Sequence, residues 1–327
     1  MDKKISVAIP TYNQAQYLYT SVLSAYQQTL KPFEIIVYND CSTDNTSEVL
    51  QKMRSEIKGL KVVHQEKNRG ISINKEACLR ACSGDYILLL DSDDKLSPNY
   101  CETLVNLLEM YPEAGYAHGN VQEIDENEKK TKIRSLYRKE EYLSPDKDLK
   151  RQIQGMKVAA NIIIYKKEAL ERINYFNCKA NFAEDWYMLC ELAAVGYGNA
   201  FSSKILSSYR VWSDAGKIRQ KRKLEEIYGV TLVYNEVLKP AFIKRGWSLK
   251  PIEKAITKRA INYSDCLAVN YFSKEEKKKL HQALLQLSNT TYARFIFKIR
   301  TNKLNRILVL KKKLVMNSKN IIKYFIK

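Results

Sequence analysis

The chain has 327 residues, 45% of them hydrophobic and 10% aromatic, so it can bury a core and is not disordered throughout. No apolar run approaches the roughly 18 residues that span a bilayer, and the N-terminus lacks a signal-peptide pattern, which together favour a cytoplasmic protein. The formal net charge of +19 is confined to one end: residues 1–210 carry 28 basic and 28 acidic side chains, whereas residues 211–327 carry 27 and 8.

The first 120 residues alternate short apolar runs with segments of helical periodicity. The apolar runs predict strands at 5–11, 33–38, 61–65 and 85–90. The periodic segments predict helices at 14–30, after residue 44, at 71–82 and after residue 97, where Ser97 is expected to cap the helix and Pro98 to take its first position. Strands and helices that alternate in this way predict a mostly parallel sheet with right-handed crossovers.

The next part of the chain is less regular. Residues 121–155 are polar and mixed in charge, which is typical of a long loop or a short hairpin near a functional site. A strand is predicted at 158–165, a helix at 184–195 and a last strand at 204–211. From residue 217 the pattern is helical throughout, with lysine-rich faces. We therefore expect an α/β domain followed by a basic, α-helical C-terminal region.

Polar clusters follow three of the predicted strands: Thr11-Tyr12-Asn13, Asn39-Asp40 and Asp91-Ser92-Asp93-Asp94. In open α/β sheets, ligands bind beyond the carboxyl ends of the strands. The third cluster holds three carboxylates, which repel one another unless a cation binds. Such ligands suit Mg²⁺ or Mn²⁺ together with substrate phosphates, although a solvated loop before the next helix is the alternative. Neither GxxxxGK[ST] nor a GxGxxG after the first strand is present, which disfavours a P-loop or a dinucleotide site.

Taken in order, these clusters resemble the motifs of the family 2 glycosyltransferases, which have the GT-A fold. The resemblance spans roughly residues 5–212 and is carried by ISVAIPTYN at 5–13, EIIVYNDCSTD at 34–44, NRGIS at 68–72, GDYILLLDSDD at 84–94 and FAEDW at 182–186. It implies a Rossmann-like, mostly parallel sheet with flanking helices over residues 1–215. That domain would divide into a nucleotide-binding half (1–120) and an acceptor-side half (121–215), followed by the basic helical region (216–327).

The resemblance implies that six residues contact the nucleotide-sugar: Thr11, Tyr12, Asp40, Lys75, Asp91 and Ser92. Thr11, Tyr12 and Asp40 would line the nucleotide pocket, with the Asp40 carboxylate accepting a hydrogen bond from the base. Lys75 and Ser92 would also contact the nucleotide-sugar. The alternative for Asp40 is a turn-forming residue before a helix.

The resemblance also implies a metal site and a base. Asp91 and Asp93 match the family's DxD motif, so Asp93 would be the main ligand of Mn²⁺ or Mg²⁺ and Asp91 would in addition contact the ribose or the sugar. Asp94 would be a supporting carboxylate. Asp185 matches the general base, with Glu184 beside it; the alternative is an acidic residue that the helix dipole favours at a helix N-terminus.

Three positions depart from the family pattern. Asn39 stands where members commonly have a first Asp. Lys75 stands where many have an Arg, so a phosphate or base contact there would be a point charge instead of a fork. Trp212 stands where many carry a His, and it would either stack on a sugar or pack as an ordinary aromatic. These changes bear on nucleotide recognition more than on the class of reaction.

The implied reaction moves a sugar from a nucleotide-diphosphate donor, preferably a UDP-sugar, to an acceptor hydroxyl with inversion at the anomeric carbon. Asp185 would take the acceptor proton, and the cation at Asp93 would neutralise the departing diphosphate. The expected setting is bacterial surface polysaccharide synthesis, such as capsule or O-antigen, on a carbohydrate or lipid-linked carbohydrate acceptor.

The basic C-terminal region has its own pattern. Between 293 and 327, apolar residues recur at helical spacing among Lys and Arg: Leu304, Ile307, Leu308, Leu314, Val315, Ile321, Ile322 and Phe325. Such a helix lies in a membrane interface, so we expect peripheral attachment to the anionic inner face of the plasma membrane; packing on the domain is the alternative.

Two other classes of function compete with the enzyme. Nucleic-acid binding would use the same basic charge, but no groove-reading or base-stacking motif is present and the acidic cluster would be unexplained, so no nucleic acid is expected. A non-catalytic scaffold on the same fold is the other class. The presence of Asp40, Asp93 and Asp185 argues against it.

Overall fold

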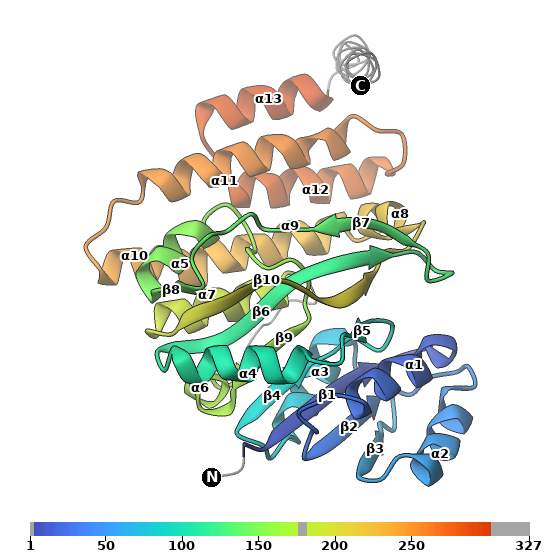
Figure 1. The fold of residues 1–327 in the computed structure, drawn as a ribbon. Helices are drawn as coiled ribbons and strands as arrows, with labels where there is room; N and C mark the ends of the chain where they lie inside the picture. Colours follow the sequence, from blue (N-terminus) through green and yellow to red (C-terminus); the bar gives the residue numbers. More distant parts are fainter. Residues whose placement is uncertain (1–2, 176–181, 302–327) are drawn as a thin grey trace, which may run out of the picture.

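The computed structural model describes residues 3–175 and 182–301, which form a β-sheet flanked by helices and a helical layer at one end (Figure 1). The strands are β1 (Ile5–Thr11), β2 (Glu34–Asn39), β3 (Leu60–His64), β4 (Tyr86–Leu89), β5 (Lys95–Leu96), β6 (Ala114–Ile124), β7 (Lys130–Arg134), β8 (Tyr142–Leu143), β9 (Ile163–Lys166) and β10 (Gly198–Arg210). The helices are α1 (Ala15–Tyr26), α2 (Thr46–Glu56), α3 (Ile71–Arg80), α4 (Tyr100–Met110), α5 (Pro145–Gln152), α6 (Lys167–Arg172), α7 (Glu184–Ala194), α8 (Ala215–Lys221), α9 (Lys223–Leu232), η1 (Val233–Leu238), α10 (Lys239–Lys244), α11 (Lys250–Tyr263), η2 (Ser264–Leu267), α12 (Lys274–Leu287) and α13 (Thr291–Thr301).

Within the described residues, the strands form one sheet in the order β3-β2-β1-β4-β9-β6-β10-β5, with β7 paired to β6 and β8 to β10. Strands β3, β2, β1 and β4 are parallel to one another. Strand β9 is antiparallel to both β4 and β6, and β6 is parallel to β10. Strands β6 and β10 therefore run in the same direction as β4, and their carboxyl ends lie at the same edge. The predicted mostly parallel sheet with flanking helices is confirmed.

The sheet is apolar on both faces, as expected when helices cover both. All of β1 is buried, and its side chains alternate between the two faces. Ile5, Val7 and Ile9 belong to the cluster that includes Leu18 of α1. Ala8 belongs to the cluster on the opposite face.

Most predicted elements are confirmed, with ends that differ by a few residues. One local prediction is wrong: Ser97 does not cap the following helix, because α4 begins at Tyr100 and Asn99 is its N-cap residue. Ser97 and Pro98 form a turn instead, in which the Tyr100 amide donates to the Ser97 carbonyl (3.0 Å). Residues 121–155 are more regular than a loop, since they contain most of the β6–β7 hairpin, β8 and α5.

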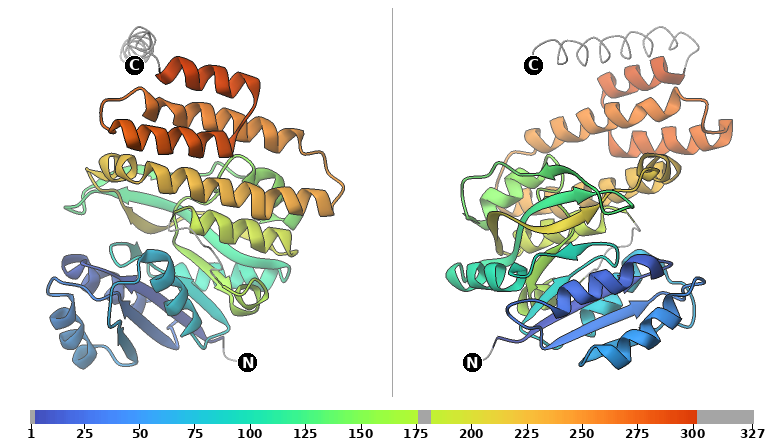
Figure 2. Two further views of the ribbon diagram at one scale, coloured as in Figure 1. Left: turned by 180° about the vertical axis from the view of Figure 1, so that it is seen from behind. Right: turned by 45° about the vertical axis from the view of Figure 1, so that its right-hand side comes forward.

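The C-terminal helices share a hydrophobic cluster with α5 and α7. Trp186 and Cys190 of α7 belong to the same cluster as Tyr234 and Phe242, and the rings of Trp186 and Tyr234 meet edge to face at 5.4 Å. Both views in Figure 2 show α9 and α11–α13 stacked at the end of the molecule opposite β1–β3. The core is thus continuous across the predicted division between residues 215 and 216, and the two-domain description stays a prediction.

No helix within 3–175 or 182–301 combines the length and the apolar character that crossing a bilayer requires. The predicted apolar stripe from Leu304 to Phe325 lies outside the described residues. Its contact with a membrane therefore stays a prediction.

Glu34, at the start of β2, ties three segments of the fold together. Its Oε1 accepts hydrogen bonds from Ser6 Oγ (2.6 Å) and from the backbone nitrogen and Oγ of Ser83 (2.7 Å each), and its Oε2 lies 2.5 Å from Lys61 Nζ. Burial would raise the pKa of Glu34, but the hydrogen bonds from Lys61, Ser6 and Ser83 outweigh it and lower the pKa to about 2. An ionised Glu34 therefore joins β1, β2, β3 and the turn before β4.

Replacing Glu34 with alanine is expected to lower the free energy of unfolding by about 3 kcal/mol, because hydrogen bonds to a charged group are strong and their donors would lose their acceptor. The folded pKa lies below the ordinary value of 4.5, so this stabilisation is complete above pH 4.5 and is lost as the pH falls toward 2. Urea unfolding at pH 7 and pH 4 measures both effects. Glu66→Ala, which removes an exposed carboxylate, is the control, and an equal effect of the two variants would contradict the prediction.

Candidate functional site

A cavity of about 520 Å³ opens beyond the carboxyl ends of β1, β2 and β4, and we call it the first cavity. It is lined by every residue predicted to bind the nucleotide-sugar and by both predicted metal ligands: Thr11, Tyr12, Asp40, Lys75, Asp91, Ser92 and Asp93. These residues are far apart in the sequence, and the parallel strands bring them to one edge of the sheet. The predicted site residues on this side therefore form one group in space.

Asp40 is buried at the end of β2, and both of its carboxylate oxygens accept backbone hydrogen bonds. Oδ1 accepts from the amide of Arg69 (2.8 Å), and Oδ2 accepts from the amide of Gly70 (2.9 Å). Gly70 has a φ of 86°, a conformation that suits glycine, and it immediately precedes α3. Asp40 thus fixes the turn before α3, and because each oxygen can accept more than one hydrogen bond it can still face a ligand.

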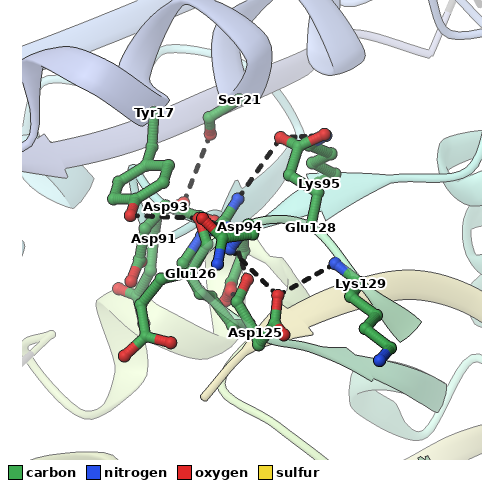
Figure 3. A network of polar contacts seen from close by, with 12 residues as sticks. Tyr17, Ser21, Asp91, Asp93, Asp94, Lys95, Asp125, Glu126, Glu128 and Lys129 are labelled. Atoms are coloured by element: carbon green, nitrogen blue, oxygen red, sulfur yellow. Dashed lines mark hydrogen bonds and ion pairs between the residues drawn. The ribbon is translucent and has the colours of Figure 1, made fainter. Parts of the chain in front are cut away.

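Residues 91–94 form a turn that we call the acidic loop. Figure 3 shows Asp91, Asp93 and Asp94 between helix α1 and the turn of the β6–β7 hairpin. On the α1 side, Ser21 Oγ donates to the carbonyl of Asp91 (3.2 Å). On the other side, the amide of Arg210 donates to Asp94 Oδ1 (2.8 Å), and its Nε donates to the Asp93 carbonyl (2.9 Å). The end of β10 therefore holds the acidic loop in place.

Trp212 contacts the acidic loop and is not among the described residues that line the first cavity. Its indole Nε1 donates to Asp93 Oδ2 (2.9 Å), and its ring meets that of Tyr17 edge to face at 5.4 Å. An indole N–H is a donor only, so Trp212 orients Asp93 but supplies no ligand to a metal ion. The predicted stacking of Trp212 on a sugar stays a prediction.

The carboxylates of the acidic loop crowd one another. Burial, followed by the charge of Asp91, raises the pKa of Asp93, and burial with the charges of Asp93 and Asp91 raises that of Asp94 well above its usual value. Asp94 Oδ2 is buried without a hydrogen-bond partner among the described residues. A hard divalent cation would relieve this crowding, so the donor set fits Mg²⁺ or Mn²⁺. No three His, Cys, Asp or Glu side chains in the described part of the chain are grouped so that they could hold a metal ion by themselves.

Lys75 lies in the wall of the first cavity, and its side chain is only 2% exposed. Its Nζ is 3.6 Å from Asp91 Oδ1, 3.6 Å from Glu184 Oε1 and 3.5 Å from Asp185 Oδ1. Burial alone would lower the pKa of Lys75, but the charges of Asp185, Asp91 and Glu184 raise it well above its usual value. One buried cation therefore joins the acidic loop to the two carboxylates at the start of α7. The contact of Lys75 with a phosphate or base stays a prediction.

Asp185 lies in the first turn of α7, where the helix dipole favours an acidic side chain. The residue that precedes this turn, Ala183, has a φ of 64°, in the left-handed region that residues with a Cβ rarely adopt. Asp185 Oδ1 faces Lys75, and Oδ2 accepts a hydrogen bond from Nδ2 of Asn161. Burial raises the pKa of Asp185 to about 8, although Lys75 opposes the rise. A carboxylate in this setting can accept a proton near neutral pH.

A second cavity of about 540 Å³ lies beside the first and shares Ile71 and Arg222 with it. Glu184 and Asp185 line this second cavity. Much of the remaining wall belongs to the segment that runs from α8 to α11, through Arg219, Arg222, Glu226, Val230, Arg259 and Tyr263. Asp185 therefore faces a different cavity from the acidic loop, and Lys75 connects the two.

Helix α9 approaches the start of α7 at Gly229. A Cβ atom placed on Gly229 would lie 2.0 Å from the carbonyl oxygen of Phe182 and 2.9 Å from its carbonyl carbon, so only glycine fits there. Phe182 and Ala183 lead directly into Glu184 and Asp185. The C-terminal helices thus support the backbone that carries Asp185 and also line the second cavity.

Three residues of the site were not predicted: Asn161, Arg210 and Arg222. Asn161 is a polar residue beside an apolar run, which is a usable signal for an inward-facing polar group. Arg210 is a charged residue at the end of a predicted strand, immediately before Val211 and Trp212, and such a residue requires partners when the strand is buried. Arg222 lies in the basic run 221–223, and nothing in that run distinguishes it from its neighbours.

Comparison with known proteins identifies the relatives of this chain. The family model described as "Glycosyl transferase family 2" matches residues 6–173, about half of the chain. The glycosyltransferases GlyA and GlyG of Streptococcus pneumoniae are 36% and 34% identical over 128 residues, which cover 39% of this chain but only 18% of GlyA and 42% of GlyG. The putative teichuronic acid biosynthesis glycosyltransferase TuaG of Bacillus subtilis is 25% identical over 258 residues, covering 79% of this chain and 97% of TuaG.

Solved structures share the fold. TarS of S. aureus (residues 1–349) superposes with a TM-score of 0.59 at 17% identity, covering 91% of this chain and 89% of that one. The mannosyltransferase PcManGT of Pyrobaculum calidifontis, solved with GDP-Man and Mn²⁺, superposes with a TM-score of 0.56 at 17% identity, covering 92% and 84%. These likenesses show the fold, which is the expected GT-A fold. Since the family model covers half of the chain, including the residues before Arg222 that line the first cavity, the chain belongs to glycosyl transferase family 2.

Proposed function

We propose that this chain is a metal-dependent, inverting glycosyltransferase that moves a sugar from a nucleoside-diphosphate-sugar to a hydroxyl of a carbohydrate acceptor. The observation that carries the proposal is the junction at Lys75. There the acidic loop, which lines the first cavity, and Asp185, which lines the second, approach the same ammonium group within 3.6 Å. Donor and acceptor would thus occupy adjoining cavities, with the base at their boundary.

The first cavity would hold the donor. Thr11, Tyr12 and Asp40 would contact the nucleoside, and the half-exposed ring of Tyr12 offers a face on which a base can stack. Ser92 and Asp91 would contact the ribose or the sugar. We propose a UDP-sugar as donor; TarS has been solved with UDP and with UDP-GlcNAc, and PcManGT with GDP-Man.

Asp93, with Asp91, would hold the divalent cation, with Asp94 behind them. When bound, Mg²⁺ or Mn²⁺ supplies positive charge that neutralises the departing diphosphate. Trp212 and Arg210 fix the orientation of Asp93 before the donor arrives, because they donate to its Oδ2 and to its carbonyl oxygen respectively.

Asp185 would act as the base for the acceptor hydroxyl. The acceptor oxygen forms a bond to the anomeric carbon while the bond from that carbon to the diphosphate oxygen breaks. The bonding pair leaves with the diphosphate, and the hydroxyl proton passes to a carboxylate oxygen of Asp185. Attack from the second cavity, opposite the leaving group, inverts the anomeric configuration. Lys75 and Asn161 orient the carboxylate of Asp185 by contacting one oxygen each.

We further propose that the reaction belongs to bacterial surface polysaccharide synthesis, on a lipid-linked carbohydrate acceptor at the inner face of the plasma membrane. TuaG, whose printed name refers to teichuronic acid biosynthesis, aligns over most of this chain. Residues 211–327 carry 27 basic and 8 acidic side chains, a balance that suits an anionic lipid surface.

A thermal-shift panel tests donor binding. UDP-sugars with Mn²⁺ or Mg²⁺ are expected to raise the Tm by several degrees, since a ligand at 100 times its Kd stabilises by about 2.7 kcal/mol. Asp93→Asn is expected to remove most of the metal-dependent shift, whereas Glu48→Gln, which changes an exposed carboxylate of α2, should leave it unchanged. If no nucleotide-sugar stabilises the wild-type protein with either metal, the proposed function is wrong.

A further inference from the structure

The second cavity is lined by three arginines as well as by the carboxylates of Glu184, Asp185 and Glu226. Arg219, Arg222 and Arg259 all line it. Two of them have carboxylate partners: Arg219 Nη2 lies 2.5 Å from Glu226 Oε1, and Arg222 Nη2 lies 2.9 Å from Glu225 Oε2. The positive charges of Arg219 and Arg222 are therefore at least partly balanced within the protein.

Arg259 is different, because within the described residues it makes no ion pair with a carboxylate. Its Nη2 donates to the carbonyl oxygen of Gln154 (3.0 Å), and its guanidinium carbon lies 4.9 Å from the ring centroid of Trp186. The second contact places Arg259 beside the residue that follows Asp185. Carbonyl oxygens and ring faces hold a guanidinium in place without cancelling its charge.

Lys157 is a further cation near Arg259, and Arg151 lies near Lys157. Burial, followed by the charges of Arg151 and Arg259, lowers the pKa of Lys157, so each arginine is close enough to Lys157 to repel its charge. None of the three makes an ion pair with a carboxylate in the part of the chain that the structure describes. Lys157 follows Met156, which lines the second cavity. Uncompensated cations beside a cavity favour an anionic ligand.

The same cavity also offers surfaces for a sugar ring. It is lined by Phe182, Trp186, Tyr209 and Tyr263. Each of these aromatic side chains has an apolar face, and all except Phe182 also carry a polar group. A planar guanidinium binds a phosphate or carboxylate group through two parallel hydrogen bonds, which also fixes its orientation. The wall of the second cavity therefore carries groups for both parts of an acidic sugar.

We propose that the second cavity takes an acidic acceptor, a sugar chain whose phosphate or carboxylate group binds to Arg259 while a neighbouring hydroxyl faces Asp185. This inference rests on the glycosyltransferase function proposed above and adds the chemical class of its acceptor. Arg259 is then a determinant of acceptor specificity. Lys157 and Arg151 strengthen the positive field around the bound anion.

Calorimetry on the full chain, saturated with UDP and Mn²⁺ at constant ionic strength, tests the proposal with three probes. Methyl β-D-glucuronide carries a carboxylate, glucose 6-phosphate carries a phosphate, and methyl β-D-glucoside is neutral. The wild-type protein is expected to bind at least one anionic probe about tenfold more tightly than the neutral one. Arg259→Gln should remove that preference without changing the affinity for UDP, and Arg259→Lys should retain part of it.

The matched control is Arg294→Gln, which removes one positive charge from the exposed face of α13. It should leave the preference intact, and an equal loss in this variant would mean that net charge, not Arg259, is responsible. If Arg259→Gln fails to fold, Lys157→Gln tests the effect of the positive charge near Arg259. This variant should weaken binding of the anionic probes by a smaller factor. Equal affinity of the wild-type protein for all three probes overturns the inference. Failure of UDP itself to bind would instead overturn the proposed donor site.

Discussion

Replacing Asp185 with asparagine is expected to lower kcat by roughly 10²–10⁴-fold, the usual contribution of a general base. Asparagine has nearly the same shape and can still contact Lys75 and Asn161, but its amide cannot take up the acceptor proton. The Kd of the nucleotide-sugar should change little, because Asp185 lines the second cavity and not the first. Turnover assays and calorimetry with the donor measure the two quantities.

Glu191→Gln is the matched control for this variant. Glu191 lies on the same helix, and burial raises its pKa to about 7, yet it lines neither of the two cavities in the described structure. Its replacement should leave kcat within about twofold of the wild-type value. A similar loss of activity in both variants, or an equal loss of donor binding with Asp185→Asn, would contradict the assignment of Asp185 as the base.

The pH dependence follows from the environment of Asp185. As the proposed base, Asp185 must be ionised to act, and burial raises its pKa to about 8, above its ordinary value. The wild-type kcat/KM is therefore expected to increase as the pH rises toward 8 and to level off above it. The residual activity of Asp185→Asn should lack this rise.

Replacing Lys75 with methionine is expected to have the largest effect on stability. The change keeps an unbranched chain but removes the cation that lies within 3.6 Å of Asp91, Glu184 and Asp185. Breaking a buried ion cluster leaves uncompensated charges, so the free energy of unfolding should fall by about 3–5 kcal/mol. Urea unfolding of the full chain at pH 7 measures this loss.

A second readout separates positioning of the base from a purely structural role. Lys75 lowers the pKa of Asp185, so without it that pKa should rise further and the increase in kcat/KM should move to higher pH. Lys52→Met is the control: its pair with Glu56 is exposed, and exposed pairs contribute about 0–1 kcal/mol. An unshifted pH profile would mean that Lys75 has only a structural role. A stability loss below about 1 kcal/mol would contradict both the structural role and the positioning of Asp185.

The part of the fold around the first cavity was predictable because its signals are local. Each strand of the β3-β2-β1-β4 group is a short apolar run, and each of β1, β2 and β4 is followed by polar residues that the parallel arrangement must bring together. Strand β6 was missed, since AGYAHGNVQEI interrupts its apolar residues with glycine, histidine and amides, and its pairing with β7, β9 and β10 makes it a strand. Ser97 looked like a cap, but helix α4 starts three residues later.

The surroundings of the second cavity were less predictable because they depend on contacts between distant segments. Asn161, which donates to Asp185, comes from the bend that precedes β9, 24 residues earlier in the chain. Arg222, in the turn between α8 and α9, and Arg259, on α11, reach the second cavity from a part of the chain that the charge distribution associates with a separate basic region. Periodicity shows that those segments are helical, but it does not show which face of each helix packs against α7. That information resides in tertiary contacts such as the one between Gly229 and Phe182.

The close approach at Gly229 has a consequence for how this protein can be divided or diversified. The residues proposed to bind the donor lie before residue 94, whereas much of the acceptor-side wall lies after residue 208. If the two cavities hold donor and acceptor as proposed, exchange of the C-terminal helices between relatives would alter the choice of acceptor while keeping the choice of donor. Such a chimera would keep Asp185 in place only if the incoming helix has a glycine where it meets the carbonyl of Phe182. One residue without a side chain therefore limits which C-terminal helices can be combined with this sheet.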